Sequence, residues 1–118
     1  MLVCKFGGTS MANSATIAQV ADIISADEQR RYVVVSAPGK RDKQDTKVTD
    51  LLYKCFAEAQ VSGSCKETFK LVKERFDSII EGLNIDLDLS SDYDEIEENI
   101  NSSTTADYAA SRGEYLSA

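Results

Sequence analysis

Hydrophobic and polar positions follow two different periodicities along this chain. Residues 2–4 and 32–35 form short, continuously apolar runs, which are typical of parallel strands buried on both faces. Between them, apolar residues recur at i, i+3, i+4 and i+7, at Ile17, Val20, Ala21 and Ile24. This spacing predicts a helix with one apolar face, with Asn13 or Ser14 as its N-cap. The three segments together predict a β-α-β unit, whose crossover is right-handed in nearly all proteins.

The rest of the chain is patterned for helices. One apolar stripe runs through residues 48–59, and a second, after a Ser-Gly-Ser break, runs through residues 69–83 and closes near Gly82. A weaker stripe covers residues 93–100, and the segment from about residue 104 is again helical in pattern. The sequence therefore predicts an α/β fold with few parallel strands and several helices.

The predicted elements are unbalanced, with several helices and only two strands. Two parallel strands cannot form a sheet that is buried on both faces, yet both runs have the composition of fully buried strands. We therefore expect residues 1–118 to be part of a longer chain whose further strands lie downstream.

Charge excludes some classes of partner. The chain has 20 acidic and 13 basic residues, a formal net charge of -7, and such a surface repels nucleic acid and anionic lipid. We expect neither partner. Because the same charge repels ATP, any phosphate site must use local backbone N–H groups and a few lysines. No apolar run approaches the roughly 20 residues of a membrane span, and the N-terminus lacks the pattern of a signal peptide.

The cysteine and histidine content narrows the chemistry further. Cys4, Cys55 and Cys65 are odd in number and lack metal-type spacing, which indicates free thiols in a reducing cytosol. Histidine is absent, which removes His-based triads and His metal sites. The acidic run at residues 92–98 is better explained as the solvated face of a helix than as a metal site. We predict no metal ligand in this chain.

A candidate anion site follows the first predicted strand. The segment reads Lys5-Phe6-Gly7-Gly8-Thr9-Ser10. Glycines allow close approach of the backbone to a ligand, and successive N–H groups in such a turn form an anion cradle. The lysine adds a positive charge and the two hydroxyls add donors. Taken alone, the segment is better explained as a glycine-rich turn, and it matches neither the Walker A nor the dinucleotide-binding pattern.

The loop after the second predicted strand should open on the same edge, because ligands bind beyond the carboxyl ends of parallel strands. Its basic residues are Lys40, Arg41, Lys43 and Lys47. For Arg41 and Lys43 we favour simple exposure to solvent. For Lys40, exposure and ligand binding are equally supported. Thr49, at the start of the next helix, either caps that helix or binds a ligand.

The last segment carries polar residues on one helical face. Asp107, Ser111 and Glu114 are spaced i, i+4 and i+7. Gly113 lies inside the predicted helix at a cost of about 1 kcal/mol relative to alanine, which indicates close approach of backbone or ligand. The pattern alone favours a solvent-facing stripe with a tolerated glycine.

Three segments together resemble the aspartate kinases. They are residues 5–10, residues 34–40 with 47–52, and residues 111–118, which contain the Ser-x-Gly-Glu pattern. The resemblance implies the amino acid kinase fold, a three-layer α/β/α sandwich around a mostly parallel sheet. It also implies that residues 1–118 form the N-terminal, substrate-side portion of the kinase domain. The nucleotide lobe and the regulatory ACT domains would be absent from this chain.

The resemblance implies an activity and its cofactors. ATP, with Mg²⁺, would transfer its γ-phosphate to the side-chain carboxylate of L-aspartate and give 4-aspartyl phosphate, the first step of lysine, threonine and methionine biosynthesis. Lys5 would be the catalytic residue that bridges the ATP phosphates. Further phosphate contacts are implied at Gly7, Gly8, Thr9, Ser10 and Ser36. Thr49 and Glu114 would hold the aspartate, with Glu114 pairing its α-ammonium.

Other readings remain open. The parent enzyme is expected to be a cytoplasmic homo-oligomer, and residues 1–118 alone are expected to be inactive. One alternative is another carboxylate kinase of the same fold, similar to acetylglutamate kinase. Glu114 discriminates, because only a free α-amino group needs a carboxylate partner. A second alternative is a non-catalytic interaction module that uses its helical stripes for docking.

Overall fold

The computed structural model describes residues 1–102 and 104–118. Two strands, β1 (Leu2–Phe6) and β2 (Arg30–Val35), form a parallel pair. The helices are α1 (Ser14–Ser25), α2 (Val48–Ser62), α3 (Lys66–Leu83), α4 (Ser90–Ser102) and α5 (Ala106–Ser117), and a short 3-10 helix, η1 (Gly8–Met11), follows β1. The predicted α/β class with few parallel strands and several helices is confirmed. No helix among these residues is both long and apolar enough to cross a membrane.

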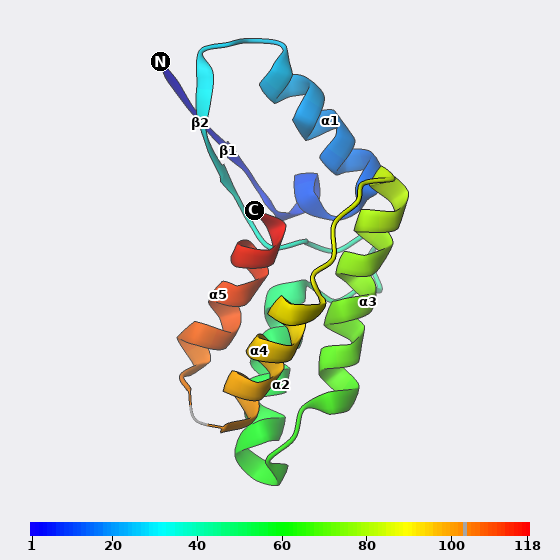
Figure 1. Cartoon of the computed structure of the whole chain (residues 1–118), viewed down its shortest axis with the longest axis vertical. Coiled ribbons are helices and arrows are strands. Elements are labelled where there is room, and N and C mark those ends of the chain that lie inside the picture. Colours follow the sequence, from blue (N-terminus) through cyan, green and yellow to red (C-terminus); the bar gives the residue numbers. More distant parts are fainter. Residues whose placement is uncertain (103) are drawn as a thin grey trace.

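The β1-α1-β2 unit forms as the sequence predicts. The register pairs Cys4 with Val33 and Phe6 with Val35, and α1 runs back alongside the two strands (Figure 1). Asn13 caps α1 through a capping box, in which its side chain accepts from the Thr16 N–H and the Thr16 hydroxyl contacts the Asn13 backbone. Of the two predicted caps, Asn13 is therefore the one used.

The strands are more exposed than their apolar composition predicts. Val3 is 70% exposed and Val34 is 53% exposed. Phe6 contributes with Val20 and Ile23 to a hollow between β1 and α1, so α1 covers one face of the sheet. Val3 and Val34 lie on the opposite face, which nothing covers among the described residues. Within the described residues the sheet therefore has one covered face, as expected of a sheet of two parallel strands.

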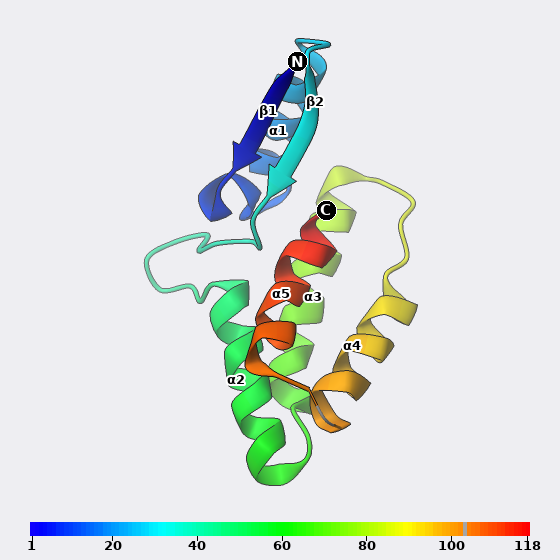
Figure 2. The same cartoon turned by 90° about the vertical axis from the view of Figure 1, so that its left-hand side faces the viewer.

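The hydrophobic core lies among the four later helices and away from the sheet. Figure 2 shows α2 to α5 packed together at one end of the molecule, with the strands and α1 at the other. The molecule measures 48 × 29 × 26 Å along its principal axes. Every predicted stripe contributes buried residues, among them Leu52, Phe69, Val72, Ile96 and Ile100. The three helical stripes are confirmed.

Two details of the helical region refine the sequence pattern. Helix α3 continues through Gly82 and ends at Leu83, where Asn84 takes a left-handed conformation with φ of 53°. The predicted end of this helix near Gly82 is therefore confirmed. Gly82 also allows α1 to pack closely, because a Cβ there would lie 2.2 Å from the Ser14 hydroxyl.

The buried cysteines of the helical core are free thiols, as the sequence predicts. Cys55 and Cys65 form no disulfide. Burial raises the pKa of both thiols, and a protonated buried thiol is unreactive.

Candidate functional site

A pocket of about 380 Å³ lies at the carboxyl edge of the two strands. We call it the edge pocket. Its walls come from the loops after β1 and β2, the N-terminus of α2, and α5. Its lining residues are Gly8, Thr9, Ser36, Ala37, Pro38, Gly39, Lys40, Lys47, Thr49 and Glu114. Five predicted site residues are thus brought together from four separate segments, namely Gly8, Thr9, Ser36, Thr49 and Glu114.

The loops after β1 and β2 interlock at the floor of the edge pocket. The Gly39 N–H donates to the Gly8 carbonyl at 2.8 Å, and the Ser36 N–H donates to the Phe6 carbonyl at 3.0 Å. A Cβ on Gly39 would lie 2.7 Å from the Gly8 carbonyl carbon and 3.1 Å from the Thr9 nitrogen. Glycine at position 39 is therefore required for the two backbones to touch.

We expect Gly39→Ala to destabilise the protein by about 1–3 kcal/mol, because the added methyl group meets backbone atoms that cannot rotate away. Gly7→Ala is the matched control, because a Cβ at Gly7 would meet nothing within 4 Å. Thermal unfolding of both variants without ligand checks the prediction. Equal melting temperatures for the two variants would show that the loops are not in tight contact.

Helix α5 approaches the edge pocket through its glycine. A Cβ on Gly113 would lie 2.6 Å from the Cβ of Ala37 and 3.4 Å from Leu52, so any side chain would push α5 away. The next residue, Glu114, lines the edge pocket. Asp107 and Ser111 do not line it, which separates Glu114 from the solvent-facing stripe that the pattern alone favours. The predicted close approach at Gly113 is confirmed. The group that Gly113 approaches is the Cβ of Ala37, which cannot rotate away because it is attached directly to the backbone.

The N-terminus of α2 forms another wall. Lys47 is the N-cap and provides no side-chain capping bond, so the alternative that Thr49 caps this helix is wrong. Thr49 instead lines the edge pocket together with Lys47 and Lys40. A helix N-terminus carries partial positive charge and unpaired N–H groups, and two lysines beside it make this wall suited to an anion.

Three predicted site residues do not line the edge pocket. Lys5 belongs to β1, pairs with Val34 in the sheet and is exposed. Ser10 lines the separate hollow between β1 and α1, and Gly7 is exposed between β1 and η1. Their implied phosphate contacts remain predictions.

Two residues of the loop after β2 were expected to be exposed to solvent. Lys43 is exposed, and Arg41 is exposed but also forms an ion pair with Asp45 at 2.7 Å.

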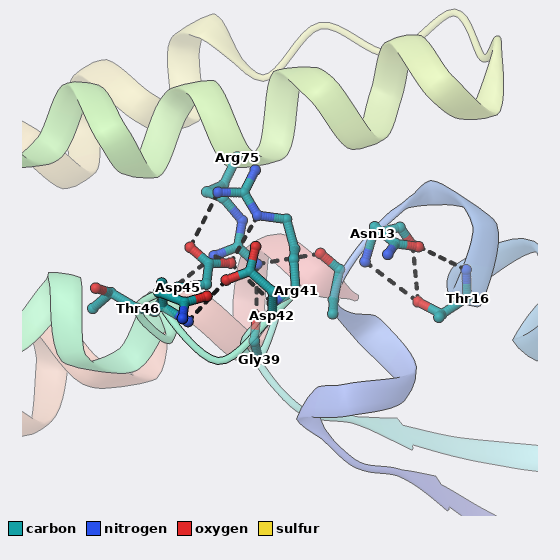
Figure 3. Close-up of polar contacts among 10 residues, drawn as sticks. Asn13, Thr16, Gly39, Arg41, Asp42, Asp45, Thr46 and Arg75 are labelled. Carbon is teal, nitrogen blue, oxygen red and sulfur yellow. Dashed lines mark hydrogen bonds and ion pairs between the residues drawn. The ribbon is translucent and has the colours of Figure 1, made fainter.

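The sequence gives no prediction for Arg75, which lies behind the edge pocket. This residue of α3 is 5% exposed, and its guanidinium contacts Asp45 at 3.4 Å. Figure 3 shows Arg75 reaching from α3 toward Gly39, Asp45 and Thr46. The sequence does contain an indication that Arg75 is buried. The residue lies three positions after Val72 and four before Ile79, on the buried face of α3. A cation within an apolar stripe indicates a buried polar cluster.

In this cluster the Asp45 carboxylate is shared by two guanidinium groups, those of Arg41 and Arg75. The hydrogen bond from the Arg41 guanidinium, aided by Arg75, holds the pKa of Asp45 well below its usual range. Burial lowers the pKa of Arg75, and the nearby Asp45 carboxylate opposes that shift. Asp45 therefore stays ionised and balances a guanidinium that solvent hardly reaches.

Few side chains near the edge pocket could coordinate a metal ion. Among residues 1–102 and 104–118, no group of three or more acidic, cysteine or histidine side chains could hold a metal ion. The edge pocket has one carboxylate, that of Glu114. Mg²⁺ in nucleotide sites is often held by one or two carboxylates and the substrate phosphates. These residues alone do not form a Mg²⁺ site.

The profile of the amino acid kinase family matches residues 1–118. The chain belongs to the amino acid kinase family. Aspartokinase 3 of Bacillus subtilis (strain 168) is 45% identical over 85 residues, which cover 72% of this chain and 19% of that protein. The chain thus spans about a fifth of the length of this curated relative.

Solved structures of amino acid kinases share the architecture described above. Aspartate kinase of Clostridium acetobutylicum is 44% identical with a TM-score of 0.95, over 98% of this chain and 27% of that one. Aspartokinase III of E. coli, solved in complex with aspartate and ADP, is 28% identical with a TM-score of 0.72, over 98% of this chain and 26% of that one. The predicted resemblance and the predicted fold family are confirmed.

Proposed function

We propose that the protein containing residues 1–118 is an aspartate kinase, which transfers the γ-phosphate of ATP to the side-chain carboxylate of L-aspartate. The edge pocket is the observation that carries this proposal. It joins a carboxylate, a helix N-terminus and two lysines in one cavity, which suits a small molecule bearing both an ammonium and carboxylate groups. The relatives named above are aspartate kinases by name.

Each wall of the edge pocket has a proposed role. Glu114 pairs with the α-ammonium of the substrate, and Thr49 donates its hydroxyl to a substrate oxygen. Gly8, Thr9 and Ser36 lie along the path of the phosphoryl group. Gly7, Ser10 and Lys5 contact the ATP phosphates, and the Lys5 ammonium stabilises the charge of the transferring group.

The chemistry needs no histidine. The nucleophile is a carboxylate, which is already ionised at neutral pH, so no general base is required. Positioning and charge stabilisation then account for catalysis, as in other phosphoryl transfers. When bound, Mg²⁺ would neutralise charge on the ATP phosphates. The residues of this chain hold the acceptor and supply hydrogen-bond donors.

The proposal extends to the larger protein. We propose that residues 1–118 form the substrate-side portion of the kinase domain and that a nucleotide lobe and regulatory ACT domains lie elsewhere in the same protein. The protein would then be a cytoplasmic homo-oligomer in lysine, threonine and methionine biosynthesis, and residues 1–118 alone would be inactive. The coverage of about a quarter of the solved kinases supports this division.

Trapping of the acyl phosphate with hydroxylamine tests the function. The full-length protein should form hydroxamate that depends on both L-aspartate and Mg-ATP, and none with N-acetylglutamate. Hydroxamate from N-acetylglutamate instead would favour the acetylglutamate kinase alternative. No hydroxamate from either substrate, with a folded protein that contains a nucleotide lobe, would reject the kinase activity and favour an interaction module.

A further inference from the structure

Arg75 connects three backbone segments, one of which lines the edge pocket at Gly39, without lining the pocket itself. Its guanidinium donates to the carbonyls of Ala12, Gly39 and Thr46, at 3.2, 2.7 and 3.0 Å. These carbonyls belong to the turn after η1, the loop after β2, and the residues just before α2. One side chain of α3 therefore joins three backbone segments that are distant in sequence, and Figure 3 shows it between Gly39 and Thr46.

The contact with Gly39 sets the direction of the next peptide N–H. A trans peptide is planar, so its C=O and N–H point to opposite sides, and the described residues contain no cis peptide bond. Because the Gly39 carbonyl points toward Arg75, the Lys40 N–H points away from it. Gly39 and Lys40 line the edge pocket, whereas Arg75 does not.

The neighbouring peptides hold this arrangement in place. The Gly39 N–H donates to the Gly8 carbonyl at 2.8 Å, and the Pro38 carbonyl accepts from the Val48 N–H at 3.0 Å. Within residues 1–102 and 104–118, by contrast, the Lys40 N–H donates to no protein acceptor. The N–H groups of the two neighbouring residues are paired, that of Gly39 with the Gly8 carbonyl and that of Arg41 with the Asp45 carboxylate. The Lys40 N–H between them is therefore held in place and available as a donor.

We propose that Arg75 is a positioning residue, which directs the Lys40 backbone N–H into the edge pocket as a donor to a carboxylate of the bound amino acid. The identity of that amino acid as L-aspartate rests on the proposed function. Arg75 does not bind the substrate itself, because its charge is balanced by Asp45 at 3.4 Å and its donors are used by the three carbonyls.

Steady-state kinetics of the full-length protein provide the first test. R75K keeps the charge but loses the planar fork of donors, and R75M loses both. We expect both variants to raise the KM for aspartate by about 10-fold, the effect of one lost hydrogen bond to a charged group, with a much smaller change in kcat. K73M is the matched control, because Lys73 lies on the same helix but pairs with Glu97 of α4.

The D45N variant distinguishes the role of the guanidinium hydrogen bonds of Arg75 from the role of its ion pair with Asp45. It removes the carboxylate partner and leaves the three carbonyl contacts of Arg75, so KM for aspartate should stay unchanged. An increase in KM for D45N equal to that for R75K would overturn the proposal in favour of the ion pair. Losses of activity that only follow the melting temperature, with KM unchanged, would also overturn it.

An NMR signal of Lys40 gives a second readout that does not depend on turnover. In protein labelled with ¹⁵N-lysine, the Lys40 amide peak is assigned by its loss in K40R. Aspartate should shift this peak saturably in the wild type and in K73M, and not in R75K. A shift that persists in R75K would overturn the proposal.

Failure of the proposed function can be told apart from failure of this inference. If the wild type forms no aspartyl hydroxamate, the same titration is made with inorganic phosphate as the anion. A Lys40 shift present in the wild type and lost in R75K would still support the positioning role. No shift with either anion in the wild type would overturn it.

Discussion

Lys5→Ala is expected to lower kcat of the full-length protein by about 10²–10³-fold, the effect of removing one group that stabilises charge in a transition state. In the proposed mechanism the Lys5 ammonium balances the charge on the transferring phosphoryl group. Lys5 is exposed on the sheet face opposite α1, and it takes part in no ion pair among the described residues. Its removal should therefore leave the fold intact. Initial rates of hydroxamate formation at saturating aspartate and Mg-ATP measure the effect.

Lys43→Ala is the control for this prediction. Lys43 is also an exposed lysine, in the loop after β2, but it lies outside the edge pocket. Its replacement changes the net charge equally and should leave kcat unchanged. A Lys5→Ala protein with native thermal unfolding and near-native kcat would show that the phosphate role assigned to Lys5 is wrong.

Glu114→Gln is expected to reduce kcat/KM for aspartate by about 10²-fold, because the variant leaves the α-ammonium of the substrate without its charged partner. The side chain lies on the pocket wall that Gly113 brings against Ala37. Among the described residues its carboxylate forms no ion pair, so the charge is available to a ligand. The loss should appear mainly in KM for aspartate, with KM for Mg-ATP unchanged.

Asp107→Asn provides the comparison on the same helix. Asp107 is an exposed carboxylate in the first turn of α5, outside the edge pocket. It should leave both KM values unchanged. If Glu114→Gln and Asp107→Asn behaved alike, Glu114 would not be the ammonium partner, and the discrimination between aspartate and N-acetylglutamate would need another explanation.

Local periodicity accounts for what the sequence predicts well. The helix between the strands and the stripes of α2, α3 and α4 follow directly from apolar spacing. The shared edge of the two loops follows from the rule that parallel strands end on the same side. For this reason Gly8, Ser36 and Thr49 could be expected in one place before any distance was known. Thr105, in a polar stretch typical of helix caps, caps α5 through its hydroxyl, which accepts from the Tyr108 N–H, while Ser103 lies outside the described residues.

Contacts between distant segments account for what the sequence does not predict. Arg75 binds backbone carbonyls that lie 63, 36 and 29 residues away in the chain, and a backbone carbonyl has no signature in the sequence. The meeting of Gly113 with Ala37 depends likewise on the angle at which α5 packs. The apolar composition of a strand indicates how much of it can be buried, whereas its exposure in this structure depends on which elements cover it.

The long separations around Arg75 also determine the order in which the site can assemble. Helices α2 to α5 are close in sequence and share one core, so they can associate quickly, whereas contacts between distant residues form more slowly. Ala12 leaves the ribosome 63 residues before Arg75, and the loops after β1 and β2 lack this common anchor until α3 has formed. Although both loops precede α2 in the chain and are synthesised before it, their final shape is set only when the helical part has folded beneath them.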